Sequence, residues 1–130
     1  DVLYTWAGPE ISVASTKAYS TQLAVIYLLA LYIGEQLGKF TQEQLSAYIA
    51  ALEKLPEQID EMLKHKENIQ FFASKYFNAS DMYFIGRNVD YAASLEASLK
   101  LKEISYIHSE AYAAGELKHG PISLTRRPPL

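Results

Sequence analysis

The sequence contains no cysteine among its 130 residues. This absence excludes disulfides, thiolate metal ligands and a cysteine nucleophile from the chain. The formal net charge is only −3 at pH 7, and no basic cluster of the kind that binds nucleic acid is present. The longest apolar run, residues 23–33, is shorter than the ~20 residues that span a bilayer. We therefore expect a soluble, cytoplasmic protein with no nucleic-acid or membrane partner.

The hydrophobic fraction of 49% is ordinary for a globular protein, and its periodicity predicts mostly helices. Ser15 or Thr16 is expected to cap a helix that ends near Gly34 or Gly38. Thr41 and Gln44 have the spacing of a capping box. Further helices are expected from Pro56, over residues 68–77, and over residues 90–106 with Asp90 as the cap.

Residues 1–5 are expected to be the end of a strand, and residues 82–85 have the pattern of a short buried strand. Two strands separated by a mostly helical segment favour an α/β fold that is predominantly helical, although two strands cannot complete a doubly wound sheet. Both chain ends are abrupt, and residues 126–130 continue no element. We expect a fragment of a longer protein with an irregular tail.

Charge gathers in residues 100–121, a segment that otherwise resembles buried helix and turn. On a helix at about 100° per residue, Glu96, Lys100 and Glu103 share one narrow sector between apolar neighbours. One interpretation is an ordinary solvated i,i+4 ion pair. The other is a carboxylate whose basicity is set by an adjacent lysine, as proton transfer requires.

His119 lies between a short helical turn and Gly120-Pro121, a loop setting that favours a functional histidine. His65 has no such setting and is expected to be solvated. Ser15 follows a hydroxyl-rich loop, where a helix N-terminus can bind an anion or sugar hydroxyls, although simple capping would also explain it. The histidines and carboxylates show no metal-ligand spacing, so we expect no metal.

Two segments, AGPEISVASTKAYSTQ and FIGRNVDYAASLEASLKLKEISYIHSEAYAAGELKHGP, resemble the glucosamine-6-phosphate synthase family, the isomerizing glutamine–fructose-6-phosphate transaminases. The similarity covers residues 7–124 and falls in the isomerase region, which is built from two sugar-isomerase (SIS) domains. It implies that residues 1–38 end the first SIS domain, residues 39–79 form a helical connection, and residues 80–130 open the second.

The resemblance implies a parent enzyme that converts fructose 6-phosphate and glutamine-derived ammonia into glucosamine 6-phosphate, in amino-sugar biosynthesis. Glu103 matches the base that moves a proton between C1 and C2, and Lys100 matches the lysine that assists it. His119 matches the ring-opening histidine, which in the family reaches the neighbouring subunit of a homodimer. Val13 and Ser15 match positions that contact the sugar phosphate. No cofactor is implied.

The sequence also departs from the family. Ala97 and Ser12 stand where glycine is frequent, and both changes are small. The family's glutaminase domain, its phosphate-binding loop and its Schiff-base lysine have no counterpart here, so we expect this chain alone to be inactive.

Three other interpretations remain open. The first is a non-catalytic SIS module that binds a sugar phosphate, and the second is a helical piece that uses its apolar surface to bind a partner. The third is a simple sugar-phosphate isomerase, which the residues from 100 to 121 favour less than the synthase.

Overall fold

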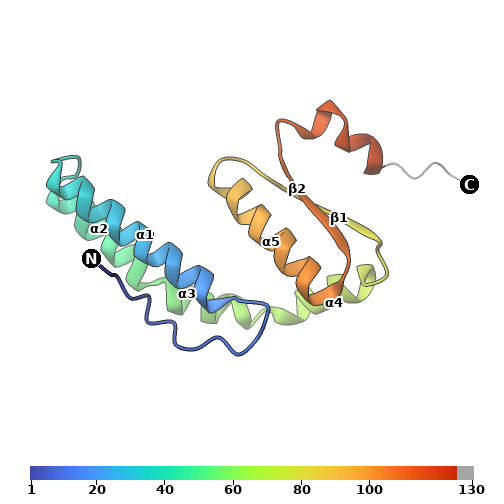
Figure 1. The fold of residues 1–130 in the computed structure, drawn as a ribbon, viewed down its shortest axis with the longest axis horizontal. Helices are drawn as coiled ribbons and strands as arrows, with labels where there is room; N and C mark the ends of the chain where they lie inside the picture. Colours follow the sequence, from blue (N-terminus) through green and yellow to red (C-terminus); the bar gives the residue numbers. More distant parts are fainter. Residues whose placement is uncertain (126–130) are drawn as a thin grey trace, which may run out of the picture. The chain divides into compact units, whose positions relative to one another are not determined.

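The structure is a computed structural model that describes residues 1–125, so the expected tail at residues 126–130 lies outside it. The chain divides into two compact units, Asp1–Lys75 and Tyr76–Leu130. The first is helical and the second contains a small parallel sheet (Figure 1). The expected α/β class, mostly helical in this span, is therefore confirmed. The expected division after residues 38 and 79 stays a prediction.

Four helices make up most of the first unit, after an irregular stretch over residues 1–16. They are α1 (Lys17–Gln36), α2 (Gln42–Glu53), α3 (Leu55–Leu63) and α4 (Lys66–Tyr76). Each one corresponds to an expected helix, and Pro56 lies in the first turn of α3 as its fixed φ favours.

Caps explain two of the helix starts differently. At α2 the Thr41 side chain accepts from the Gln44 backbone N–H, and the Gln44 side chain accepts from the Thr41 N–H. The expected capping box is therefore confirmed. At α1 the residue in the cap position is Thr16, but it makes no side-chain cap bond. The expected capping by Ser15 or Thr16 is wrong, because the Ser15 hydroxyl donates to the Glu10 carboxylate at 3.1 Å instead.

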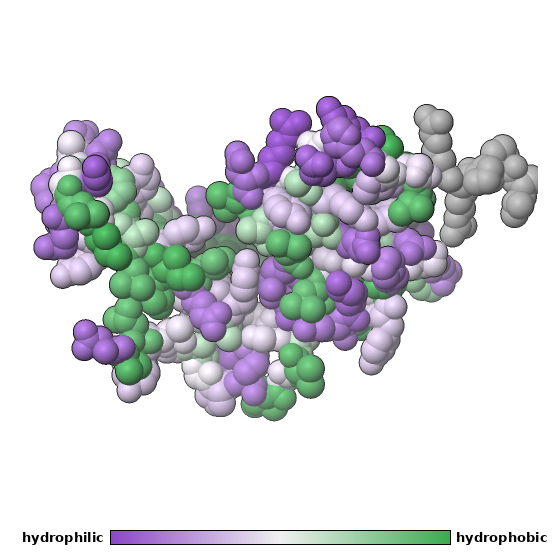
Figure 2. Space-filling view, turned by 45° about the horizontal axis from the view of Figure 1, so that its top comes forward, coloured by the Kyte–Doolittle hydropathy of each residue, from purple (hydrophilic) through white to green (hydrophobic). Residues whose placement is uncertain are grey.

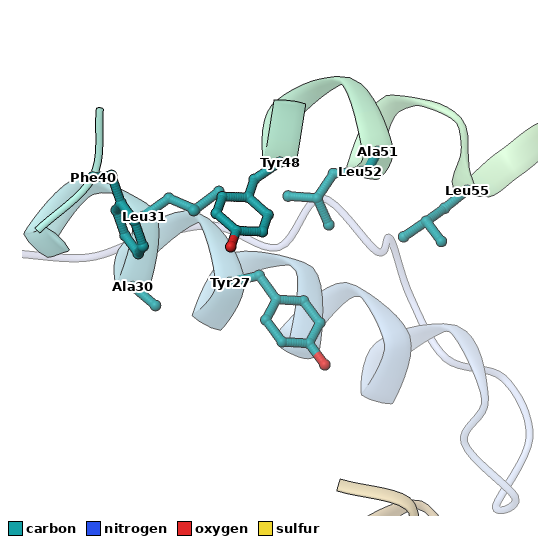
Figure 3. A pocket seen from close by; sticks show the side chains of 8 residues that line it. All are labelled: Tyr27, Ala30, Leu31, Phe40, Tyr48, Ala51, Leu52 and Leu55. Carbon is teal, nitrogen blue, oxygen red and sulfur yellow. The ribbon is translucent and has the colours of Figure 1, made fainter. Parts of the chain in front are cut away.

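The Phe40 ring, in the connection between α1 and α2, packs directly on Gly34 of α1, where an added Cβ atom would collide with the ring. Phe40 in turn contacts Tyr48 edge to face, with centroids 5.6 Å apart. Beside this contact lies a groove of about 340 Å³ (Figure 3). Its lining comes from α1, Phe40, α2 and the start of α3: Tyr27, Ala30, Leu31, Phe40, Tyr48, Ala51, Leu52 and Leu55.

The second unit is a βαβ arrangement. Strand β1 (Asp81–Gly86), helix α5 (Val89–Ser105) and strand β2 (His108–Ala113) follow one another, and α5 packs on both strands (Figure 1). The strands pair in parallel from Asp81 opposite His108 to Gly86 opposite Ala113. Two 3₁₀ turns follow, η1 (Leu117–His119) and η2 (Pro121–Thr125).

The turn from β1 into α5 depends on Gly86. This glycine is buried, and a Cβ there would collide with the backbone of Asp90. Asn88 then takes a positive φ of 49° in the cap position without a side-chain bond. The expected cap at Asp90 is wrong, because the helix has already begun at Val89 and Asp90 lies in its first turn.

The strand expectations were half right. Residues 82–85 lie within β1, but their side chains are half-buried or exposed rather than buried, and residues 1–5 form no strand. A strand needs a hydrogen-bonded neighbour, and among residues 1–125 the only pairing is β1 with β2. Strand β2 was not anticipated, because its sequence HSEAYA has no continuous apolar run.

Apolar side chains are widely exposed on the described part of the chain. No hydrophobic residue among residues 1–125 is buried, and Figure 2 shows apolar side chains on the surface. The described helices include none with both the length and the apolar character required to cross a membrane.

Candidate functional site

Three charged side chains meet on α5. The Lys100 ammonium lies 2.5 Å from a Glu103 carboxylate oxygen and 3.6 Å from a Glu96 carboxylate oxygen. These distances follow from helical spacing, since residues three and four apart are neighbours on one face. The structure thus brings together the proposed base, Glu103, and its helper, Lys100, and adds Glu96 on the other side of the lysine.

The charges of this cluster support one another. The hydrogen bond from Lys100 to Glu103 is the main cause that raises the pKa of the lysine, and burial, the next largest cause, acts against it. The negative charges of Glu103 and Glu96 raise that pKa further. Lys100 is therefore a cation throughout the neutral range, with a carboxylate on each side.

The cluster is partly shielded from solvent. The side chains of Lys100, Glu96 and Glu103 are between 20% and 26% exposed, whereas Leu99 and Ile104 beside them are 43% and 66% exposed. The sequence predicted apolar neighbours that flank the charges, but in the structure these neighbours are more exposed than the charged side chains. A freely solvated ion pair does not describe this site.

The side of α5 opposite the charges packs against the sheet through serines. Ser94 and Ser98 are its buried residues, and Ser98 hydrogen-bonds to the buried Ser109 of β2. Small side chains let the helix approach the sheet closely. Because Lys100 and Glu103 lie on the opposite side of the helix from these serines, they point away from the sheet. The helical period places these serines opposite the charges, but it does not by itself indicate that they are buried.

His119 ends the 3₁₀ turn η1, where the sequence predicted a broken helical turn. Gly120 follows with a φ of 147°, a value that favours glycine. The histidine is exposed, and its backbone N–H bonds the Glu116 carbonyl. Within residues 1–125, no hydrogen bond or ion pair joins its imidazole to Lys100 or Glu103.

Val13 and Ser15 lie in the first unit, in the loop before α1. The Val13 side chain is 95% exposed. The loop is held by its own polar contacts, since Lys17 donates to the Pro9 carbonyl at 2.7 Å and Ser15 donates to Glu10. Val13 is therefore open to solvent, whereas the half-buried Ser15 donates its hydroxyl hydrogen to a contact within the loop.

A second row of titratable side chains lies along the sheet, and it was not identified from the sequence. His108 Nδ1 lies 2.9 Å from an Asp81 carboxylate oxygen, and His108 Nε2 lies 3.9 Å from Glu110. Tyr112 donates to Glu110. The available signal was the two-residue spacing of positions 108, 110 and 112, which places side chains on one face of a strand.

The apolar groove of the first unit lacks the groups that a sugar phosphate needs. None of its lining side chains carries a charge, and its only side-chain polar groups are two tyrosine hydroxyls. Among the described residues, no group of three or more histidine and carboxylate side chains could hold a metal ion. The charged cluster on α5 is therefore the better candidate for chemistry.

Comparison with known proteins adds independent information. Residues 75–130 match the SIS domain family. A glutamine–fructose-6-phosphate aminotransferase (isomerizing) from Clostridium perfringens is 57% identical over 127 residues, which are 98% of this chain and 21% of that protein. The glutamine–fructose-6-phosphate aminotransferase (isomerizing) from Caldanaerobacter subterraneus is 56% identical over 124 residues, which are 95% of this chain and 20% of that protein.

A solved structure agrees with both. The C-terminal domain of glucosamine-fructose-6-phosphate aminotransferase from Francisella tularensis superposes with a TM-score of 0.88 at 40% identity, and covers 92% of this chain and 34% of that one. This chain spans about a fifth of the length of the curated relatives it matches.

Proposed function

We propose, from the premise that this chain matches a segment of the SIS isomerase region of the glutamine–fructose-6-phosphate aminotransferases, that it carries the proton-transfer groups of that reaction. In this proposal the longer protein makes glucosamine 6-phosphate from fructose 6-phosphate and an amino group derived from glutamine. The observation that carries it is the partly shielded Lys100–Glu103 pair within a segment so similar to these relatives.

Glu103 is the proposed base. After an imine nitrogen has replaced oxygen at C2 of the sugar, the Glu103 carboxylate takes a proton from C1 while the nitrogen takes up a proton, which leaves an enolamine. Return of the C1 proton to C2, with loss of the proton from the C1 hydroxyl, gives an aldehyde at C1 and an amine at C2. A positioned carboxylate of this kind contributes about 10²–10⁴-fold to a rate.

Lys100 is proposed to assist in two ways. Its ammonium, 2.5 Å from Glu103, holds the carboxylate in one place before substrate arrives. Its positive charge also stabilises the negative charge that develops on the sugar oxygen during proton transfer. Glu96, 3.6 Å away, balances the remaining charge of the lysine and keeps it on this face of α5.

The other assignments rest on the residue-by-residue similarity alone. His119 is proposed to open the sugar ring, from the active site of a second subunit in a homodimer. Val13 and Ser15 are proposed to contact the sugar. We also keep as proposals the boundaries of the SIS segments, residues 1–38, 39–79 and 80–130, and a cytoplasmic location, with which a chain free of cysteine is compatible.

The test is a segment exchange. Residues 1–125 replace the matching segment of the Clostridium perfringens relative, and glucosamine 6-phosphate formed from fructose 6-phosphate and glutamine is measured. We expect the exchanged protein to be active, and Glu103→Gln to lower kcat by about 10²–10⁴-fold. Lys100→Met should cause a smaller loss, of roughly 10–10²-fold, because the base is still present.

Two matched variants control for charge loss. Glu116→Gln and Lys102→Met remove the same charges at exposed positions and should leave kcat within about twofold. An inactive exchanged protein, or full turnover with Glu103→Gln, would contradict the proposal. Retained binding of fructose 6-phosphate with full turnover in the Glu103→Gln variant would favour a sugar-phosphate-binding module over a catalytic one.

A further inference from the structure

The most deeply buried side chains in the described part of the chain are polar. Ser109 of β2 is 1% exposed and Ser98 of α5 is 2% exposed, whereas no hydrophobic side chain among residues 1–125 is buried. A buried hydroxyl is costly unless it is hydrogen-bonded. The most deeply buried part of the contact between α5 and β2 therefore depends on the hydrogen bonds of these two serines.

The two serines form a reciprocal pair whose hydrogens can be assigned. Ser109 Oγ lies 2.8 Å from the Ser98 carbonyl oxygen, to which it donates, and 3.0 Å from Ser98 Oγ. A hydroxyl has one hydrogen. Since Ser109 gives its hydrogen to the carbonyl, Ser98 must donate to Ser109 Oγ. The Ser98 hydroxyl is therefore satisfied only while Ser109 is present, whereas the Ser109 hydroxyl keeps its carbonyl acceptor without the Ser98 side chain.

This pair is the sole side-chain hydrogen-bond link between α5 and the sheet in the part of the chain that the structure describes. The neighbouring buried serine, Ser94, donates to the Asp90 carbonyl within its own helix at 2.7 Å. The large apolar side chains of α5 pack less deeply than the serines, since Leu95 is 50% and Leu99 43% exposed, and Tyr91 and Leu101 are only half-buried.

The rotation of α5 sets the direction of the charged cluster. Lys100 is two residues and Glu103 five residues beyond Ser98, so on a regular helix they point about 200° and 140° around the axis from it. The hydroxyl pair faces the strand, and the charges consequently face away from it. A rotation that lets an unpaired hydroxyl reach solvent would carry Glu103 with it.

We propose that Ser98 and Ser109 are matched positioning residues that fix the rotation of α5 and thereby aim Lys100 and Glu103 at the substrate. They act through the helix and do not contact the reacting atoms. The catalytic part of this inference rests on the proposed function, whereas the coupling of the two hydroxyls does not.

The coupling is tested in the 130-residue chain by amide hydrogen exchange along α5, which needs no activity. Ser109→Ala should speed exchange about tenfold, because it leaves the Ser98 hydroxyl without its acceptor in a dry contact. Ser98→Ala should have a smaller effect, because Ser109 still reaches the carbonyl. The double variant should return to within threefold of the unsubstituted chain, since no unpaired hydroxyl remains.

The positioning role is tested with the same variants in the exchanged Clostridium perfringens protein. Ser109→Ala should lower kcat about tenfold with KM within twofold, because a small misplacement of a reacting group affects the rate more than binding. The double variant should recover most of kcat. Ser94→Ala, which removes a buried hydroxyl that does not reach the sheet, is the matched control and should stay within twofold.

The two proposals fail in different ways. Losses that multiply in the double variant, in exchange or in kcat, would show that the two serines act independently and would overturn the pairing. A kcat within twofold for Ser109→Ala, in a protein that Glu103→Gln inactivates, would overturn the positioning role alone. Full turnover with Glu103→Gln would overturn the proposed function while the exchange data still decide the pairing.

Discussion

The hydroxyl of Tyr112 donates a hydrogen bond to the carboxylate of Glu110, two residues before it on the same face of β2. The Tyr83 ring of β1 packs edge to face against Tyr112, with centroids 5.6 Å apart. The bond to Glu110 favours the protonated phenol, and it is the main cause that raises the pKa of Tyr112 to about 12, with burial and the charge of Glu110 acting in the same direction.

This pair predicts a loss of stability in alkali. Between pH 10, where an unfolded tyrosine titrates, and about 12, the folded chain holds a proton that the unfolded chain has lost. The free energy of unfolding must therefore fall as pH rises through this window. Below the window the contribution of Tyr112 is fully present and does not change with pH. The raised pKa of Lys100 acts in the same direction above its ordinary value of 10.5.

Urea unfolding at a series of pH values from 8 to 12 measures this effect. Tyr112→Phe should flatten the decline, because phenylalanine has no proton to lose. Tyr106→Phe is the matched control, since that ring is 91% exposed and its loss should not change the slope. Equal slopes in the Tyr112→Phe variant and the unsubstituted chain would contradict the prediction.

A second prediction concerns the turn between β1 and α5. Gly86→Ala should lower the free energy of unfolding by about 1–3 kcal/mol, because the added Cβ would collide with the Asp90 backbone, which cannot rotate away. Gly115→Ala is the matched control, with nothing within 4 Å of its added Cβ. Two variants of equal stability would show that the turn relaxes freely.

A third prediction compares two threonines at helix starts. Thr41→Ala should cost about 1 kcal/mol, because it removes the hydroxyl that accepts from the Gln44 N–H. Thr16→Ala should cost much less, because Thr16 makes no such bond at α1. Urea unfolding, together with amide exchange at Gln44, provides the measurement, and an equal loss for both variants would refute the assignment of the cap.

A fourth prediction is that the 130-residue chain alone forms no glucosamine 6-phosphate from fructose 6-phosphate and ammonia. The Lys100–Glu103 pair is the proposed proton-transfer group, but the phosphate-binding loop and the Schiff-base lysine of the family that this segment resembles have no counterpart in it. Formation of the product above the background of a Glu103→Gln control would contradict this.

Local features were predictable from the sequence. The capping box at Thr41 and Gln44 needs only four consecutive residues, and the charged face of α5 needs only the helical period. Strand β1 was likewise predictable from its continuous apolar run over residues 82–85, which ends at Gly86.

Non-local features were not predictable in this way. Strand β2 is recognisable only beside its partner, 27 residues earlier in the chain at the Asp81–His108 pair. The burial of Ser98 and Ser109 depends on the same pairing, because hydroxyl residues are found mostly at the surface when no partner is in reach. The direction of α5, and with it that of Glu103, therefore followed from tertiary contacts.

The scarcity of buried apolar side chains in the described part of the chain has a thermodynamic consequence. The heat-capacity change of unfolding arises mainly from newly hydrated apolar surface, and much of that surface is already hydrated here. The stability curve of this chain should consequently be flat with temperature, with a gradual rather than a sharp thermal transition. Whatever covers these helices and strands would sharpen that transition, and calorimetry would register it as a gain in heat-capacity change.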